Sequence, residues 1–393
     1  MPVAAQTQPT RQQLAAANTA NRSMLISTGI RFRKNLGVTT APSLGATTRT
    51  KIFNVGITTS LRLLVTCPVT IGTAIATPSS RAPYNLVSNI LVTDYDNTNR
   101  INVSGLQMFL LDSLRYPLVY GYNNAVAAQA GAGLVTNPSL PTAIGNGTIS
   151  FYLDVPIAQN DHEDDGFRQD LTGSVYSQTG VGDFYCSITW NTTLYANGNV
   201  EAVFNGAATT TVVLNGVTGP SVQIWQNYIL PQPVANAKGQ AYLPIPSIDL
   251  VNVYELNGNF RTTDNIAIGQ EKLINFPNVR RVLGMVLNYV QNGAMNPGTD
   301  LTQFRLIVNG NNILKEWNPV SSQILEQRVA EGCDIWPGFY FWRFLSSPIV
   351  TNIYGNVQLG VIPSAIASSP YFEVLFESTY EKGAPLPGMA QAG

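Results

Sequence analysis

The stretch LRLLVTCPVTI, residues 61–71, alternates apolar and polar side chains with a period of two. Leucine, valine, cysteine or isoleucine stands at every odd position, whereas the even positions are mostly polar or proline, with Leu64 as the exception. Successive side chains of a β-strand point to opposite faces, so this pattern predicts a strand with one face in a core. The alternation recurs at 149–157, 184–190, 304–308, 357–361 and 372–376. Strands at this density, separated by Gly, Pro and Asn turns, predict an all-β sandwich protein.

Two segments interrupt the strands with apolar residues at helical spacing. They are NVSGLQMFLLDSLR at 102–115 and NPVSSQILEQRVAEG at 318–332. Each follows a strand that ends in an Asn-rich turn, and each precedes a long loop, a strand that runs into proline and a final strand. The architecture thus repeats after about 210 residues, without obvious sequence identity between the copies. The sequence therefore predicts two copies of one sandwich, each with an inserted helix.

The length of 393 residues also favours two domains, because one hydrophobic core rarely serves a chain this long. We expect a basic N-terminal arm with one helix at 1–49, a first sandwich at 50–232, and a second sandwich with a C-terminal tail at 233–393. In the arm, Thr10 and Gln13 can form a capping box before a run of good helix formers. The apolar stripe of this helix is thin, so the helix needs a neighbour to be stable.

The charge of the chain is low and unevenly distributed. Charged residues make up 11%, against roughly 25% in an ordinary soluble protein. Nine basic residues precede the first acidic one, Asp94; because the whole chain carries −1, the remainder carries −10. The positive arm is suited to a negative partner, either phospholipid or nucleic acid, with chance clustering as the alternative. The candidate contact residues of the arm are Arg11, Arg22, Arg31, Arg33 and Lys34.

The three cysteines, Cys67, Cys186 and Cys333, are odd in number and far apart, which fits neither a disulfide framework nor a zinc site. We expect all three to be reduced and mostly buried, as in a chain made in the cytoplasm. The opening MPVAAQTQPTRQQ has no apolar stretch, so we expect no secretory signal. No run of 18 apolar residues is present, which argues against a membrane-spanning helix.

The sequence offers little chemistry for catalysis, and we expect the protein not to be an enzyme. A Ser-His-Asp or Cys-His arrangement would have to use His162, the only histidine, which stands in an acidic run without apolar support. The same run offers hard oxygen ligands for a divalent cation, although a solvated acidic loop is the favoured interpretation. These weak candidate metal ligands are Asp161, Glu163, Asp164 and Asp165. We expect no cofactor.

Several collinear segments resemble the major capsid proteins of tectiviruses, the tailless phages with an internal membrane, which are related in fold to the adenovirus hexon. The Gln- and Ala-rich basic N-terminal helix is similar. So are DYDNTNRINVSG at 94–105, DVPIA and DLTGSVYSQ within 154–178, YLPIPSIDLVNVYELNGN at 242–259, GTDL at 298–301, and WPGFYFW with PIVTNIYGNVQLGVIPS within 336–364. The acidic insertion NDHEDDGFRQ at 160–169 departs from the family pattern.

The resemblance implies a double jelly roll, meaning two consecutive eight-stranded jelly rolls, each with an inserted helix, behind a helical N-terminal arm. It implies a major capsid protein whose homotrimers have a pseudo-hexagonal footprint and tile an icosahedral shell. The arm would lie beneath the shell, between neighbouring trimers and an internal viral membrane. Further implied partners are vertex and minor capsid proteins, without sequence-specific nucleic-acid binding. The protein would be found in the virion, and in the host cytoplasm before assembly.

The main alternative is a secreted protein with a β-sandwich that binds or cleaves carbohydrate. It would use the aromatic cluster of Trp336 and 339–342 as a sugar platform, whereas a core or subunit interface is the favoured interpretation of these residues. Paired carboxylates for glycoside cleavage need only spatial proximity, so the sequence leaves them open. This alternative predicts a secretion signal and monomers that bind glycans.

Overall fold

A computed structural model of the chain describes residues 11–381 with several gaps. The longer gaps are 116–138, 160–170 and 320–337. The shorter ones are 178–181, 200, 207–209, 217, 247–251, 292–293, 296–299, 311, 345–346, 352, 354 and 367–368.

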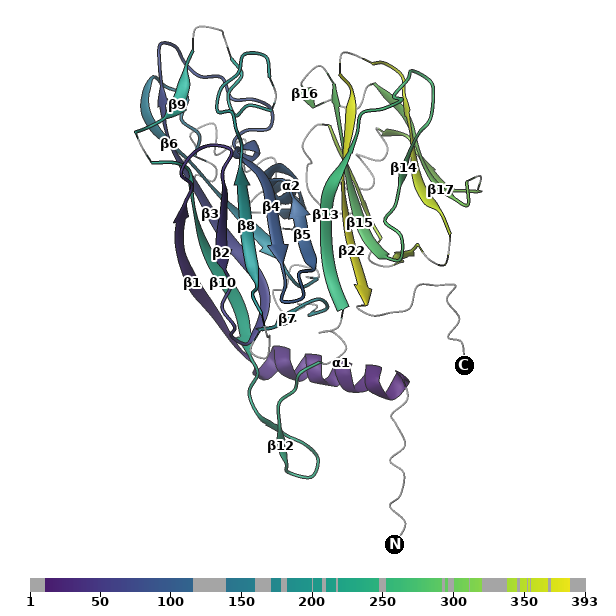
Figure 1. The fold of residues 1–393 in the computed structure, drawn as a ribbon. Helices are drawn as coiled ribbons and strands as arrows, with labels where there is room; N and C mark the ends of the chain where they lie inside the picture. Colours follow the sequence, from purple (N-terminus) through teal and green to yellow (C-terminus); the bar gives the residue numbers. More distant parts are fainter. Residues whose placement is uncertain are drawn as a thin grey trace.

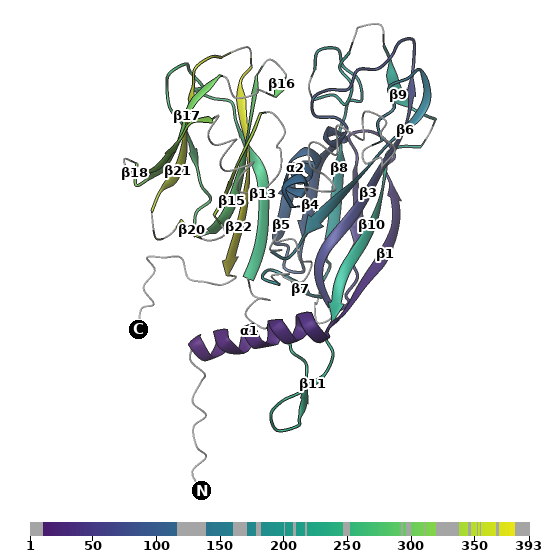
Figure 2. The same ribbon diagram turned by 180° about the vertical axis from the view of Figure 1, so that it is seen from behind.

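Two β-sandwiches stand side by side with their long strands running in the same general direction (Figure 1). Helix α1 (Arg11–Thr28) lies across one end of the strands, which we call the base. The hairpin of β11 (Val234–Ala235) and β12 (Ala241–Tyr242) projects beyond α1 at the same end (Figures 1 and 2). Among the described residues, no helix is long and apolar enough to cross a membrane.

The first sandwich packs four main strands against four. Its outer sheet, which we call the first outer sheet, has the order β1 (Ile30–Thr40), β10 (Ser221–Leu230), β3 (Ile57–Ile71) and β6 (Gly145–Pro156). The short strands β7 (Val175–Tyr176) and β9 (Val212–Leu214) also pair with β3. Its inner strands are β2 (Thr47–Lys51), β8 (Tyr185–Trp190), β4 (Val87–Thr93) and β5 (Asn99–Val103).

The second sandwich repeats this arrangement. Its inner strands are β13 (Asn252–Thr262), β22 (Tyr371–Glu381), β15 (Arg281–Gln291) and β19 (Phe339–Arg343), with the short β16 (Ala294–Met295) and β20 (Ile349–Val350) paired to β15. Its outer sheet has the order β14 (Lys272–Asn275), β21 (Val357–Pro363), β17 (Leu301–Val308) and β18 (Asn312–Trp317). The expectation of two eight-stranded units is therefore confirmed.

Two helical elements lie within the first sandwich. The 3₁₀ turn η1 (Tyr84–Leu86) precedes β4, and α2 (Gly105–Arg115) follows β5. Ser104 and Gln107 cap α2 reciprocally: the Gln107 backbone N–H donates to the Ser104 hydroxyl, and the Ser104 N–H donates to the Gln107 side chain. Tyr84 stacks on Phe109 with ring centroids 3.6 Å apart, which ties η1 to α2.

Burial follows the predicted alternation in the first sandwich but not throughout the second. From Ser60 to Ile71, β3 alternates half-buried and buried residues, with Leu61, Leu63, Val65 and Cys67 in the core. In contrast, β15 is buried at every position after Arg281. One face of this strand packs in the core of the second sandwich, while the other joins the apolar cluster of the first sandwich and α2. The second inner sheet is therefore buried on both faces.

Most expectations on individual elements are confirmed. The helix at 102–115 is α2, the arm helix is α1, and the alternating segments form strands. The expected second inserted helix at 318–332 lies almost entirely outside the described residues. The arm was expected to extend to residue 49, but residues 30–40 form β1 and residues 47–51 form β2. Their pairing partners β10 and β8 follow far along the chain, so no local pattern indicates these strands. The domain limits at 49 and 232 stay predictions.

The aromatic cluster is confirmed as core in its described part. Phe339, Tyr340, Phe341 and Trp342 are each at most 2% exposed. The rings of Tyr340 and Trp342 pack with Phe304, edge to face at 5.1 Å for Trp342, whereas Phe339 and Phe341 join the apolar cluster of the first sandwich. A sugar platform needs exposed rings, so these four residues do not form one. Trp336 lies outside the described residues.

The cysteines of the first core allow a test of the packing. Burial raises the pKa of both Cys67 and Cys186 to about 12, so at neutral pH almost no reactive thiolate is present. In a Cys333→Ser variant, which removes the cysteine outside the described residues, we expect no reaction of the native protein with a disulfide reagent such as DTNB. Unfolding in guanidinium chloride should release both thiols. Reaction of either thiol in the folded protein would show that this core is not packed as described.

Candidate functional site: the junction of the two sandwiches

The two sandwiches share a continuous sheet. Strand β5 of the first pairs in parallel with β13 of the second, with Leu256 opposite Ile101. This pairing merges both inner sheets into one ten-stranded sheet. Backbone hydrogen bonds therefore cross the junction and fix the height of one sandwich against the other.

Two glycines allow β13 of the second sandwich to lie close to the first sandwich. Gln107 of α2 donates its Nε2–H to the Gly258 carbonyl at 2.9 Å, and a side chain at Gly258 would collide with the Gln107 amide. Gly173 of the first sandwich has φ +85°, and a Cβ there would lie 2.5 Å from the backbone nitrogen of Tyr254. Any larger residue at position 173 would push the sandwiches apart.

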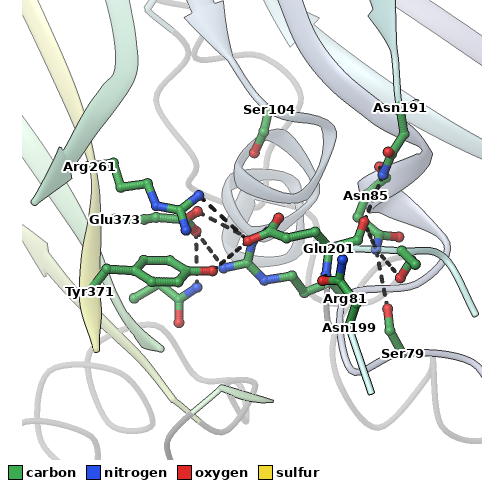
Figure 3. A network of polar contacts seen from close by, with 12 residues as sticks. Ser79, Arg81, Asn85, Ser104, Asn191, Asn199, Glu201, Arg261, Tyr371 and Glu373 are labelled. Carbon is green, nitrogen blue, oxygen red and sulfur yellow. Dashed lines mark hydrogen bonds and ion pairs between the residues drawn. The ribbon is translucent and has the colours of Figure 1, made fainter. Parts of the chain in front are cut away.

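A buried arginine crosses the junction higher on the strands. Arg81 of the first sandwich has only 5% of its side chain exposed. Its Nη2 donates to Glu373 Oε2 on β22 at 2.7 Å, and its Nη1 lies 3.2 Å from Glu201 Oε2. Figure 3 shows the guanidinium between these two carboxylates, one from each sandwich.

Two further residues of the second sandwich complete this network. The Tyr371 hydroxyl donates to Glu201 Oε1 at 2.7 Å. The guanidinium of Arg261 lies over the Tyr371 ring, 3.7 Å from its centroid, and its Nη1 is 3.6 Å from Glu201 Oε1 (Figure 3). We call Arg81, Glu201, Arg261, Tyr371 and Glu373 the junction network.

Asparagine side chains hold the segment that carries Glu201. Asn85 Nδ2 donates to the carbonyl of Ala202 at 2.9 Å, and Asn191 Nδ2 donates to that of Glu201 at 2.7 Å. The Glu201 N–H in turn donates to Asn199 Oδ1 at 2.9 Å. Side-chain amides thus replace regular secondary structure here and keep the carboxylate in reach of Arg81 (Figure 3).

The charges of the junction network balance. Burial by itself would lower the pKa of the Arg81 guanidinium, but Glu373, Tyr371 and Glu201 outweigh it and raise the pKa above its usual value. Burial raises the pKa of the Tyr371 phenol, so its hydroxyl stays neutral and can donate to Glu201. Two guanidinium groups face two carboxylates. Such an arrangement is suited to holding two domains in one orientation, since each charge is taken up by a partner.

A pocket of about 340 Å³ lies beside the junction network. Arg81, Glu201, Arg261 and Glu373 line it together with polar residues of the first sandwich. The formal charges of these four residues sum to zero.

The structure separates the candidate residues of the arm into two groups. Arg11 and Arg22 belong to α1, which is held to the base by Leu25 in a small apolar cluster with Ile57, Leu171 and Ile229. The remaining three, Arg31, Arg33 and Lys34, lie on β1 and so belong to the first outer sheet.

Within β1 the basic side chains do not all share a face. Arg31 and Arg33 line a pocket with Arg62, whereas the Lys34 ammonium lies 3.8 Å from the centre of the Phe53 ring. Sequence reasoning missed Arg62, which comes from β3. The period-two rule would have placed Arg62 on the outward face of its strand, but not beside β1.

The weak candidate metal ligands Asp161, Glu163, Asp164 and Asp165, and His162 beside them, lie outside the described residues. Among the residues that the structure describes, no group of three or more His, Cys, Asp or Glu side chains could hold a metal ion. The metal site at 161–165 therefore stays an untested candidate.

Sequence reasoning also missed the junction network. Arg81 is separated from Glu201 by 120 residues and from Glu373 by 292. Single charges in a lightly charged chain are the only signal that could have raised them as candidates, and that signal does not say which charge meets which.

Comparison with known proteins gives matches in sequence and in fold. Residues 251–382, most of the second sandwich, match the family model described as P3 major capsid protein C-terminal. Comparison with curated proteins gives no match. The crystal structure of the major capsid protein of Sulfolobus turreted icosahedral virus has a TM-score of 0.63 at 14% identity, over 90% of this chain and 98% of that one. The PBCV-1 virus capsid has a TM-score of 0.57 at 9% identity, over 90% and 94%.

Identities of 14% and 9% establish the fold, and the family match adds the role. Both sandwiches are jelly rolls, and they stand in the same arrangement as in these capsid proteins. The family is structural rather than enzymatic. Its sequence pattern in the second jelly roll, together with the double jelly-roll fold of the whole chain, identifies the protein as a viral major capsid protein, a component of the virion shell.

Proposed function

We propose that the protein forms homotrimers with a pseudo-hexagonal outline, which tile an icosahedral shell around an internal membrane. Two similar jelly rolls stand side by side in each chain, so three chains related by a threefold axis supply six similar units around a ring. The observation that carries this proposal is the locked junction. Its shared sheet and buried Arg81 fix the angle between the jelly rolls, as a regular tile requires.

The mass of the purified chain in solution tests the trimer directly. The chain weighs 42.5 kDa, so light scattering behind a sizing column should give three times this value, about 127 kDa. Negative-stain images should then show a six-lobed outline. A stable monomer would overturn the proposed trimer.

In this proposal the base faces the internal membrane, and the arm contacts either the membrane or neighbouring trimers. Helix α1, which contains Arg22, lies across this end (Figure 1). Strand β1, which begins directly after α1, carries Arg31 and Arg33, and the β11–β12 hairpin carries Lys238. Basic side chains near an anionic leaflet contribute about 1 kcal/mol each, so the arm suits this position.

Vertex and minor capsid proteins would bind elsewhere on the shell. A tectivirus-like phage is the virus type that this arrangement favours.

Deletion of residues 1–28 tests the role of the arm helix. The deletion stops before β1, so both jelly rolls and the junction network stay complete. We expect trimers to form, because no strand is lost, but shells not to assemble, because α1 no longer reaches a neighbour or the membrane. Sizing chromatography and electron microscopy of particles give the two readouts. A deletion of residues 1–9, which keeps α1 and its expected capping residue Thr10, is the matched control. Normal particles from the longer deletion would remove the proposed role of the helix.

A further inference from the structure

A polar pocket of about 400 Å³ opens on the outward face of the first outer sheet, near the base. Three arginines line it: Arg31 and Arg33 from β1, and Arg62 from β3. Thr59, Ser60, Asp154, Asn227, Tyr228 and neighbouring residues complete its wall. The pocket lies close to the attachment point of α1, because Ile229 belongs both to its wall and to the apolar cluster around Leu25.

Two of the guanidinium groups are held in place by neighbours. Arg33 Nε donates to Asn227 Oδ1 at 2.9 Å, and Asn227 Nδ2 donates to the Ser60 hydroxyl at 2.9 Å. Arg62 forms a fork on Asp154, with distances of 2.7 and 3.0 Å. Groups fixed before a ligand arrives lose little entropy on binding, which favours affinity. Arg31 is two residues from Arg33 on the same strand and therefore faces the same way.

The charge of the pocket distinguishes it from the pocket at the junction. Among the described residues that line it, three guanidinium groups accompany one carboxylate, which gives a net charge of +2. The single carboxylate, Asp154, is turned toward Arg62 and has only 9% of its side chain exposed. An anion entering the pocket therefore meets mainly positive groups. Planar guanidinium groups match the oxygen geometry of phosphate, to which they can donate two parallel hydrogen bonds.

We propose that this pocket binds a phosphate oxyanion, either the headgroup phosphate of an anionic lipid or free phosphate. Arg33 and Arg31 donate to the phosphate oxygens, Arg62 supplies the charge of the inner wall, and the Ser60 hydroxyl offers a further donor. The lipid source rests on the proposed position of the membrane at the base; the free-phosphate source does not. The pocket would give the base of the first jelly roll a specific binding site for phosphate, in addition to the general attraction between its positive charge and anions.

Titration of the purified full-length chain with inorganic phosphate at low salt, followed by calorimetry, tests the pocket itself. We expect saturable binding, weakened about tenfold by Arg33→Gln because one charge-assisted contact is lost. Arg33 is exposed, so this variant should fold normally. The matched control is Arg305→Gln, which removes a partly exposed arginine from the outer sheet of the second jelly roll and should leave binding unchanged. Failure to saturate, or equal loss in both variants, would overturn the proposal.

Vesicles distinguish the two sources of phosphate. Loss of sedimentation with phosphatidylglycerol-containing vesicles in Arg33→Gln, but not in Arg305→Gln, supports the lipid headgroup, with pure phosphatidylcholine as the neutral reference. Unchanged sedimentation together with weakened phosphate binding supports free phosphate. The chain lacking residues 1–28 separates this inference from the proposed function, because it keeps the pocket. If that chain assembles normal shells, the proposed role of α1 in assembly is wrong. Calorimetry with phosphate then still tests whether the pocket binds phosphate.

Discussion

Replacement of Arg81 by glutamine should lower the free energy of unfolding by about 3–5 kcal/mol, because it leaves the partly buried Glu373 without its cation. The same change removes the only described ion pair that joins β22 to the first jelly roll through a buried arginine. We therefore expect an additional effect on shape: trimers of the variant should lose their regular outline and assemble poorly. Equilibrium denaturation in urea measures the first effect, and electron microscopy of particles measures the second.

The matched control is Arg261→Gln in the same network. Arg261 has 49% of its side chain exposed and lies 3.6 Å from Glu201, so water screens this pair and its loss should cost at most about 1 kcal/mol. In the double variant Arg81→Gln with Glu373→Gln, the two costs should not add, since the second change removes the uncompensated charge. An Arg81 variant as stable as the Arg261 variant would show that the junction network does not hold the jelly rolls together.

Replacement of Gly173 by alanine should destabilise the chain by about 2–5 kcal/mol through two effects that combine. Its φ of +85° is unfavourable for any residue with a Cβ, and the added methyl group would overlap the backbone of Tyr254. Backbone cannot move aside as a flexible side chain can, so β13 must shift away from the first jelly roll. Calorimetric unfolding and small-angle scattering, which reports the separation of the two jelly rolls, measure the outcome.

Gly216 provides the control for the backbone effect alone. Its φ is +76°, but a Cβ there would meet no atom within 4 Å. Gly216→Ala should therefore cost only the left-handed conformation, about 1–2 kcal/mol, and leave the scattering profile unchanged. Equal losses in the two variants would mean that contact with Tyr254 does not set the spacing of the junction.

The strands of the first jelly roll could be predicted from the sequence because each is buried on one face only. In β3 the side chains at odd positions enter the core and most of those at even positions face outward, so the sequence of the strand alternates between apolar and polar residues. The helix at 102–115 was equally visible, since its apolar residues follow a helical period. The repeat of strand, helix, loop and strand then indicated two similar units, in agreement with the resemblance to capsid proteins.

The second inner sheet shows where such reasoning ends. Strand β15 is buried on both faces, so its sequence lacks alternation and resembles any continuous apolar run. Residues 30–40 look like part of a polar arm because β1 is an edge strand with most side chains exposed. Its partner β10 begins at Ser221, and no local sequence pattern predicts that two segments so far apart in the chain will pair.

The sequence by itself therefore determined the all-β class, the duplication, the inserted helix of the first unit and a basic N-terminal segment, because these depend on side-chain period and composition along the chain. Only the tertiary structure decided that β5 and β13 join two jelly rolls in one sheet, that Arg81 meets Glu201 and Glu373, and that Arg62 stands beside Arg31 and Arg33. Each of these contacts joins residues that are distant in sequence, and the energy of such a contact depends on burial and distance, which a linear pattern does not encode.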